Sequence, residues 1–149
     1  MAWSASQYVK FEDERTRPAR DLLAQVPLEH VRHAVDLGCG PGNLTATLAE
    51  RWPRAAVQGI DSSAEMLAKA APLAAGLPGL QFMQADIAGW MPDSGTDVVV
   101  SNAALQWVPG HQELMAKWLA ALRPGAWFAM QVPGNFTAPS HALMRGLAA

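Results

Sequence analysis

The sequence has one cysteine, few charged residues and no long uninterrupted apolar run. A single cysteine, Cys39, excludes an internal disulfide and suits a reducing compartment. No apolar segment is long enough to span a bilayer as a helix. The first residues are charged, with Lys10, Glu12 and Asp13, and lack the apolar core of a signal peptide. We therefore expect a cytoplasmic protein without a membrane anchor.

The charges that are present nearly balance. Eleven Lys and Arg against thirteen Asp and Glu give a net charge of −2, which provides no basic surface for nucleic acid. The four histidines are scattered without the spacing of a metal site. Hydrophobic residues make up 50% of the 149 residues, which is enough for one core. The length predicts a single domain over residues 1–149, with its oligomeric state left open.

Three glycines alternate in the stretch from Asp36 to Gly42. An apolar run containing β-branched Val35 predicts a buried strand before them, and Leu44 and Leu48 follow at helical spacing. Strand, glycine turn and helix open a nucleotide-binding βαβ unit, in which glycine lets the backbone approach a ligand. The third glycine comes one residue too early for the dinucleotide fingerprint, and no P-loop lysine follows. A tight turn without a ligand is the structural alternative.

Further strands and helices alternate along the chain and predict an α/β fold. We expect a Rossmann-like, mainly parallel, doubly wound sheet with helices on both faces. The expected strands are His33–Leu37, Ala56–Ile60, Leu80–Met83, Asp97–Ser101 and Ala126–Val132. The expected helices cover Pro18–Gln25, Asn43–Trp52, a segment capped by Ser62 and Glu65 that turns Met66 and Leu67 inward, Gln112–Leu122, and a last stretch from Ser140.

Polar residues follow the strands at the edge where such sheets bind ligands. Asp61 follows the second strand, 23 residues after Gly38, at the position where an acidic residue accepts ribose hydroxyls. Asp86 and Asn102 follow the third and fourth strands. The structural alternatives are a turn residue for Asp61 and Asn102 and a surface acid for Asp86. Cys39, between glycines, is interpreted as a small residue and not as a nucleophile.

The run from Asp36 to Gly42 resembles the first motif of class I S-adenosylmethionine-dependent methyltransferases. Other stretches resemble, more narrowly, the trans-aconitate 2-methyltransferase family, and together they cover nearly the whole chain. The N-terminal stretch and the segment from Asn102 to Trp107 are the most specific. The matching stretches are Tyr8–Leu23, Val35–Thr45, Gly59–Ser63, Ala85–Ile87, Ser101–Trp107 and Leu122–Gly125.

This resemblance implies S-adenosylmethionine as cofactor and O-methylation of a carboxylate of trans-aconitate or a related small polycarboxylic acid. A carboxylate is already ionised at neutral pH, so the reaction needs positioning and no general base or other catalytic side chain. The implied cofactor-binding residues are Gly38, Cys39, Gly40, Gly42, Asp61, Ser62, Asp86, Ile87 and Asn102. The candidate substrate-binding residues are Tyr8, Arg15, Arg17, Gln106 and Trp107. The two arginines are candidates because a polycarboxylate needs cationic partners, and a solvated helix face is their structural alternative.

The chain departs from the family at its C-terminus. The family continues for two more strands, whereas this chain is expected to end in a helix, so we expect these edge strands to be missing and the fifth strand to be exposed. Residues 1–17, with Trp3, Tyr8 and Phe11, are expected either to form a flap over the site or to be a frayed terminus. The alternatives are a methyltransferase for another small molecule, an inactive cofactor-binding fragment, and an NAD-dependent oxidoreductase, which Asn43 disfavours because it replaces a fingerprint glycine.

Overall fold

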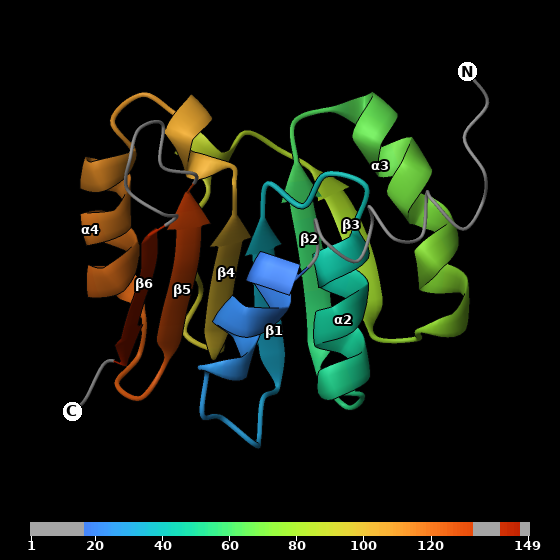
Figure 1. Ribbon diagram of the computed structural model, residues 1–149, viewed down its shortest axis with the longest axis horizontal. Coiled ribbons are helices and arrows are strands. Elements are labelled where there is room, and N and C mark those ends of the chain that lie inside the picture. Colours follow the sequence, from blue (N-terminus) through green and yellow to red (C-terminus); the bar gives the residue numbers. More distant parts are fainter. Residues whose placement is uncertain (1–16, 133–140, 147–149) are drawn as a thin grey trace.

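Six strands form one sheet in the computed structural model, which describes residues 17–132 and 141–146 (Figure 1). The spatial order is β3-β2-β1-β4-β5-β6; the first five strands are parallel, and β6 runs antiparallel to β5. Strand order reverses between β1 and β4, which is where open α/β sheets bind ligands. The strands are β1 (His33–Leu37), β2 (Ala56–Asp61), β3 (Leu80–Gln84), β4 (Val98–Asn102), β5 (Trp127–Val132) and β6 (His141–Gly146).

Helices cover both faces of this sheet. One face packs against a helix over residues 17–24 and against α2 (Asn43–Arg51), which lie in front of the strands in Figure 1. The other face packs against α4 (His111–Ala121). The remaining helices are α3 (Ala64–Ala70) and the short 3-10 helices η1 (Ala71–Gly76), η2 (Ile87–Gly89) and η3 (Leu105–Trp107). No helix in the described part of the chain is long and apolar enough to cross a membrane.

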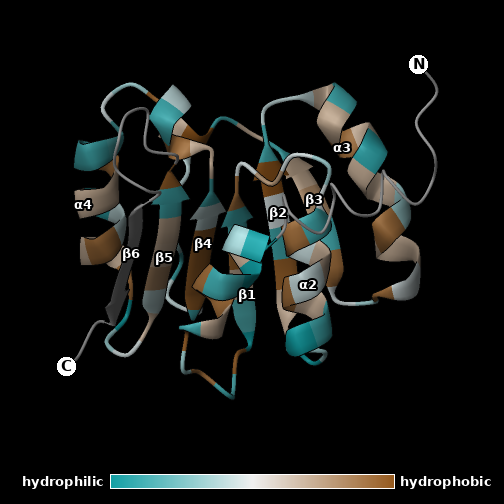
Figure 2. Ribbon diagram, in the orientation of Figure 1, coloured by the Kyte–Doolittle hydropathy of each residue, from teal (hydrophilic) through white to brown (hydrophobic). Residues whose placement is uncertain are grey.

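The central strand β4 shows how the sequence specifies this layered core. Val98 and Val100 pack in the cluster on the face of α2, and Val99 packs in the cluster on the face of α4. Successive side chains of a strand point to opposite faces, so a continuous apolar run is buried on both sides. This run appears as a brown segment of β4 in Figure 2.

A buried carboxylate, Asp97, ties the strands together at their amino ends. Its Oδ2 accepts hydrogen bonds from the backbone N–H groups of Arg32 (2.7 Å) and His33 (3.3 Å), and the Arg123 guanidinium pairs with Oδ1. Burial alone raises the pKa of Asp97, but these hydrogen bonds and the Arg123 charge lower it below its usual value. This end of the sheet is therefore held by a satisfied charge and lies opposite the edge expected to bind a ligand.

The five predicted parallel strands are confirmed to within one or two residues at their ends. The helix predicted from Ser140 is wrong, because residues 141–146 form β6. The segment is rich in helix-forming residues, but pairing with β5 overrides that local preference. The exposed edge predicted for β5 is wrong for the same reason.

The start of α3 also differs from its prediction. Its N-cap is Ser63, whose hydroxyl accepts from the Met66 N–H at 3.2 Å, and not Ser62. Ser62 has the capping-box spacing to Glu65, but the cap in the structure lies one residue later. Met66, predicted to turn inward, is 36% exposed and does not point into the core.

Candidate functional site

The glycine turn between β1 and α2 lies at the carboxyl ends of the strands. Gly38, Gly40 and Gly42 all have positive φ, at 73°, 55° and 87°. A Cβ on Gly38 would lie 2.3 Å from the Cβ of Ala104, and one on Gly42 would lie 2.8 Å from the Phe82 ring. A Cβ on Gly40 would meet nothing within 4 Å. Gly38 and Gly42 thus permit close packing, whereas Gly40 faces open space.

Asp61, at the end of β2, binds this turn through its carboxylate. Its Oδ2 accepts from the Gly40 N–H at 2.9 Å, and its Oδ1 accepts from the Ser63 N–H at 2.8 Å. The carboxylate therefore joins the glycine turn to the start of α3. Each carboxylate oxygen has two acceptor positions, so one hydrogen bond apiece leaves room for a ligand hydroxyl.

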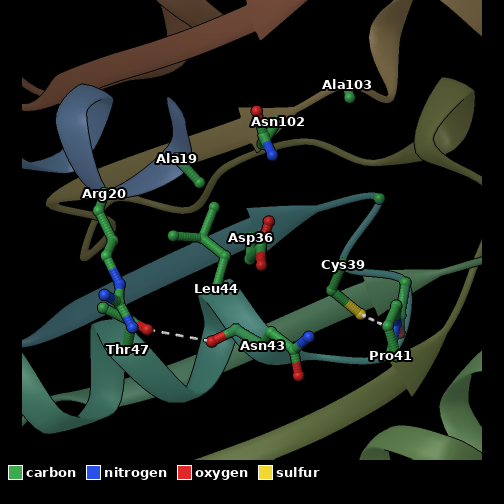
Figure 3. Close-up of a pocket in the computed structure, with 12 residues that line it drawn as sticks. Ala19, Arg20, Asp36, Cys39, Pro41, Asn43, Leu44, Thr47, Asn102 and Ala103 are labelled. Atoms are coloured by element: carbon green, nitrogen blue, oxygen red, sulfur yellow. Dashed lines mark hydrogen bonds between the residues drawn. The ribbon is translucent and has the colours of Figure 1, made fainter. Parts of the chain in front are cut away.

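Two cavities lie on either side of the glycine turn. The cavity of about 540 Å³ is lined by Asp61, Asp86 and Trp107, among others, and we call it the β2–β3 cavity. The cavity of about 370 Å³ is lined by Asp36 and Asn102, among others, and we call it the α2 cavity (Figure 3). The two cavities share Gly38, Gly40 and Ala103 in their walls. The two cavities are therefore neighbours along the glycine turn.

The structure brings most of the predicted site residues to these walls. The β2–β3 cavity is lined by Gly38, Gly40, Asp61, Ser62, Asp86, Ile87 and Trp107. The α2 cavity is lined by Gly38, Cys39, Gly40 and Asn102. Gly42, Arg17 and Gln106 line neither cavity, and Tyr8 and Arg15 lie outside the described residues.

The two side chains predicted after β4 lie in different environments. Trp107 is 80% exposed at the β2–β3 cavity, on the same side as Asp61. Gln106 donates to the Ala103 carbonyl at 2.9 Å, while its Oε1 is buried without a hydrogen-bond partner in the described part of the chain. Ala103 itself has a φ of 55°, a conformation that is uncommon for alanine.

Sequence reasoning missed Asp36 as a site residue, although it begins the glycine motif. Asp36 is 1% exposed, lines the α2 cavity and accepts from the Thr45 hydroxyl at 2.8 Å. Burial raises its pKa to about 7 against the opposing effect of the Thr45 hydrogen bond, and the charge of Asp61 raises it further. The signal available in the sequence is an acid at the end of an otherwise apolar strand, where burial is expected.

The neighbouring thiol of Cys39 is unsuited to nucleophilic attack. Burial, together with the charges of Asp36 and Asp61, raises its pKa to about 12. A thiol reacts as its thiolate, so this side chain stays unreactive at neutral pH. The geometry agrees with the interpretation of Cys39 as a small wall residue.

A family model described as a methyltransferase domain matches residues 34–125 of this chain. The chain belongs to this methyltransferase domain family. The family resemblance predicted from the glycine motif is thereby confirmed, and the match contains Asp36, Asp61, Asp86 and Asn102.

Individual relatives support the narrower resemblance. A trans-aconitate 2-methyltransferase of Rhodopseudomonas palustris (strain BisB18) is 55% identical over 146 residues, covering 98% of this chain and 56% of that protein. One from Azoarcus sp. (strain BH72) is 54% identical over 143 residues, covering 96% of this chain and 55% of that protein. The chain thus spans about half the length of these curated relatives.

A solved structure supports the fold. An S-adenosylmethionine-dependent methyltransferase from Mesorhizobium loti has 32% identity and a TM-score of 0.67, with 79% of this chain and 52% of that chain covered. The Rossmann-like fold class predicted from the sequence is confirmed.

We predict that Gly38→Ala destabilises the protein more than Gly40→Ala. Both glycines have positive φ, which costs alanine about 1–2 kcal/mol. Only Gly38→Ala adds a clash with Ala104, worth about 1–3 kcal/mol more. Urea unfolding of both variants measures the difference, and equal destabilisation would show that Ala104 does not constrain the turn.

We predict that Asp36 makes stability fall as pH rises. Its pKa is about 7 in the folded protein against 3.8 ordinarily, so the folded state binds more protons between these values. The unsubstituted protein should therefore lose roughly 2–3 kcal/mol of stability from pH 5 to pH 8 that Asp36→Asn does not lose. The free energy of unfolding of Asp36→Asn minus that of the unsubstituted protein should increase by this amount.

The control for this measurement is Glu113→Gln. Glu113 is an exposed residue in the first turn of α4 and forms no ion pair with another described residue. Urea unfolding at pH 5, 6, 7 and 8 should give a constant difference for Glu113→Gln. A constant difference for Asp36→Asn as well would contradict the raised pKa.

Proposed function

We propose that this chain binds S-adenosylmethionine and transfers its methyl group to a carboxylate of trans-aconitate or a related small polycarboxylic acid. The observation that carries the proposal is the pair of cavities that share Gly38, Gly40 and Ala103, with the Asp61 carboxylate in one of them. The names of the relatives supply the acceptor. Since the chain spans about half of those relatives, both the cofactor and the acceptor are inferences for this chain.

The residues present fit this cofactor. Its nucleoside end suits the β2–β3 cavity, because Asp61 retains acceptor positions for ribose hydroxyls after its two backbone hydrogen bonds. Ser62 lies beside it in the wall, and Asp86 and Ile87 would flank the adenine. The amino-acid end suits the α2 cavity, with Cys39 and Asn102 in its wall. Gly42 would act indirectly, by letting α2 pack against Phe82.

The bound cofactor supplies a methyl group activated by the positive charge of its sulfur. The acceptor carboxylate is ionised at neutral pH, so no protein group has to remove a proton. The protein's own contribution is to hold the acceptor in line and to exclude water. The unreactive Cys39 thiol agrees with such direct transfer, because no covalent intermediate on the protein is then needed.

The substrate-binding residues inferred from the resemblance remain predictions. Trp107 lines the β2–β3 cavity, so in this proposal it acts from the nucleoside side. Gln106 and Arg17 line neither cavity, and Tyr8 and Arg15 lie outside the described residues. The single domain over residues 1–149, the flap over residues 1–17, the cytoplasmic location and the lack of a nucleic-acid partner also remain predictions.

A second candidate function is cofactor binding without methyl transfer. The observation that favours it is the coverage of 56% of the curated relatives, because the remaining part of those relatives can contribute to an acceptor pocket. An NAD-dependent oxidoreductase is not favoured, since the family model that matches is a methyltransferase domain.

We predict that the chain binds S-adenosylhomocysteine and not NAD, and that Asp61→Ala weakens this binding at least about tenfold. A hydrogen bond to a charged group contributes roughly 1.5–3 kcal/mol, and tenfold corresponds to about 1.4 kcal/mol. Isothermal titration calorimetry measures both affinities. Because Asp61 also binds the N–H of Ser63, the control is Ser63→Ala, which removes the α3 cap and leaves the carboxylate. Binding of NAD alone, or an unchanged dissociation constant in Asp61→Ala, would contradict the prediction.

We predict that small polycarboxylic acids are the methyl acceptors. The assay measures transfer from labelled cofactor to trans-aconitate and other small acids, beside amine and phenol acceptors. Transfer to trans-aconitate should give a monomethyl ester. Transfer only to amines or phenols would contradict the carboxylate assignment, and binding of S-adenosylhomocysteine with no transfer to any acceptor would favour the second candidate function.

A further inference from the structure

The α2 cavity has a cation in its wall that the sequence did not single out. Arg20 lies on the helix over residues 17–24 and lines this cavity together with Asp36 and Asn102. Figure 3 shows its side chain extending from that helix toward Thr47 of α2. Arg17, the arginine favoured by the sequence on the same helix, lines neither cavity.

Arg20 differs from two other arginines of the described chain in having no bonded partner there. Arg51 donates to the carbonyls of Leu23 and Val26, and Arg123 pairs with Asp97. The Arg20 guanidinium makes no hydrogen bond or ion pair to any residue that the structure describes. This exposed side chain can therefore turn toward a ligand in the cavity without breaking an interaction with the described part of the chain.

The charge of the cavity wall suits an anion. Among the described lining residues the ionisable groups are Arg20, Asp36 and the protonated thiol of Cys39. Because burial raises the pKa of Asp36 to about 7, this carboxyl is substantially protonated at neutral pH and repels an anion less than an ordinary aspartate would. The Arg20 guanidinium is then the dominant charge, and Asn102 adds an amide group to the same wall.

We propose that Arg20 pairs with a carboxylate group of a ligand bound in the α2 cavity. A guanidinium suits this role, because its planar fork donates two parallel hydrogen bonds to a carboxylate. The inference rests on the proposed function, which places two carboxylates near this wall. One belongs to the polycarboxylate acceptor, and the other belongs to the amino-acid end of the cofactor.

The test measures ligand binding by calorimetry to the whole chain and to three variants. Arg20→Met removes the charge and keeps the apolar stem, and Arg20→Lys keeps the charge without the fork. Arg54→Met is the matched control. Arg54 is also an exposed arginine, but it lies just before β2, at the amino ends of the strands and away from the cavity. The probes are S-adenosylhomocysteine, and trans-aconitate added at saturating S-adenosylhomocysteine. Methylthioadenosine and the trimethyl ester of trans-aconitate are their analogues without a carboxylate.

We expect Arg20→Met to raise at least one carboxylate probe's dissociation constant tenfold or more. Arg20→Lys should recover part of the lost affinity. Arg20→Met should leave the dissociation constant of the matching neutral analogue unchanged, and Arg54→Met should leave the dissociation constants of all the ligands unchanged. A loss confined to trans-aconitate assigns Arg20 to the acceptor, and a loss confined to S-adenosylhomocysteine assigns it to the cofactor. Unchanged binding of both carboxylate probes overturns the proposal for Arg20 and leaves the proposed function standing. Failure of the unsubstituted chain to bind either carboxylate probe overturns both.

Discussion

The site depends on how closely the glycine turn approaches the loop after β4. Gly38 has no side chain, and a Cβ at this position would lie only 2.3 Å from the Cβ of Ala104. The same turn is held to β2, because the Gly38 N–H donates to the Ile60 carbonyl at 2.7 Å and the Gly40 N–H donates to Asp61. The turn is thus fixed between the end of β2 and the loop after β4, and it forms a shared wall of both cavities. A displacement of this one turn would change both halves of the site.

Asp61 combines a structural role with the acceptor capacity that a binding role would require. It anchors the turn through Gly40 and the start of α3 through Ser63, yet it still lines the β2–β3 cavity with acceptor capacity to spare. The alternative weighed from the sequence, a turn residue, is therefore also true in the structure. A carboxylate already oriented by backbone donors can accept a ligand hydroxyl without losing further side-chain freedom.

The parts of the fold that the sequence predicted are those decided by local pattern. The Val98–Val100 run identified β4, and the glycine motif identified the turn and the start of α2. The segment 141–146 could not be assigned locally, because its strand conformation comes from pairing with β5. Arg20 could not be selected over Arg17, since only the packing of their helix decides which of them lines a cavity. Contacts between distant segments, and not propensity, settled these cases.

The two ends of the sheet each contain a buried aspartate, and the two carboxyls differ in their pKa. Asp97 and Asp36 are each 1% exposed, yet the pKa of Asp97 is lowered and that of Asp36 is raised to about 7. Asp97 accepts from backbone donors and the Arg123 guanidinium, whereas among the described residues the donor to Asp36 is the Thr45 hydroxyl. Burial raises the pKa of both carboxyls, but only around Asp97 do donors and a cation outweigh it. The carboxylate at the amino end is satisfied by described residues, while the carboxyl end keeps acceptor capacity that described residues leave unused.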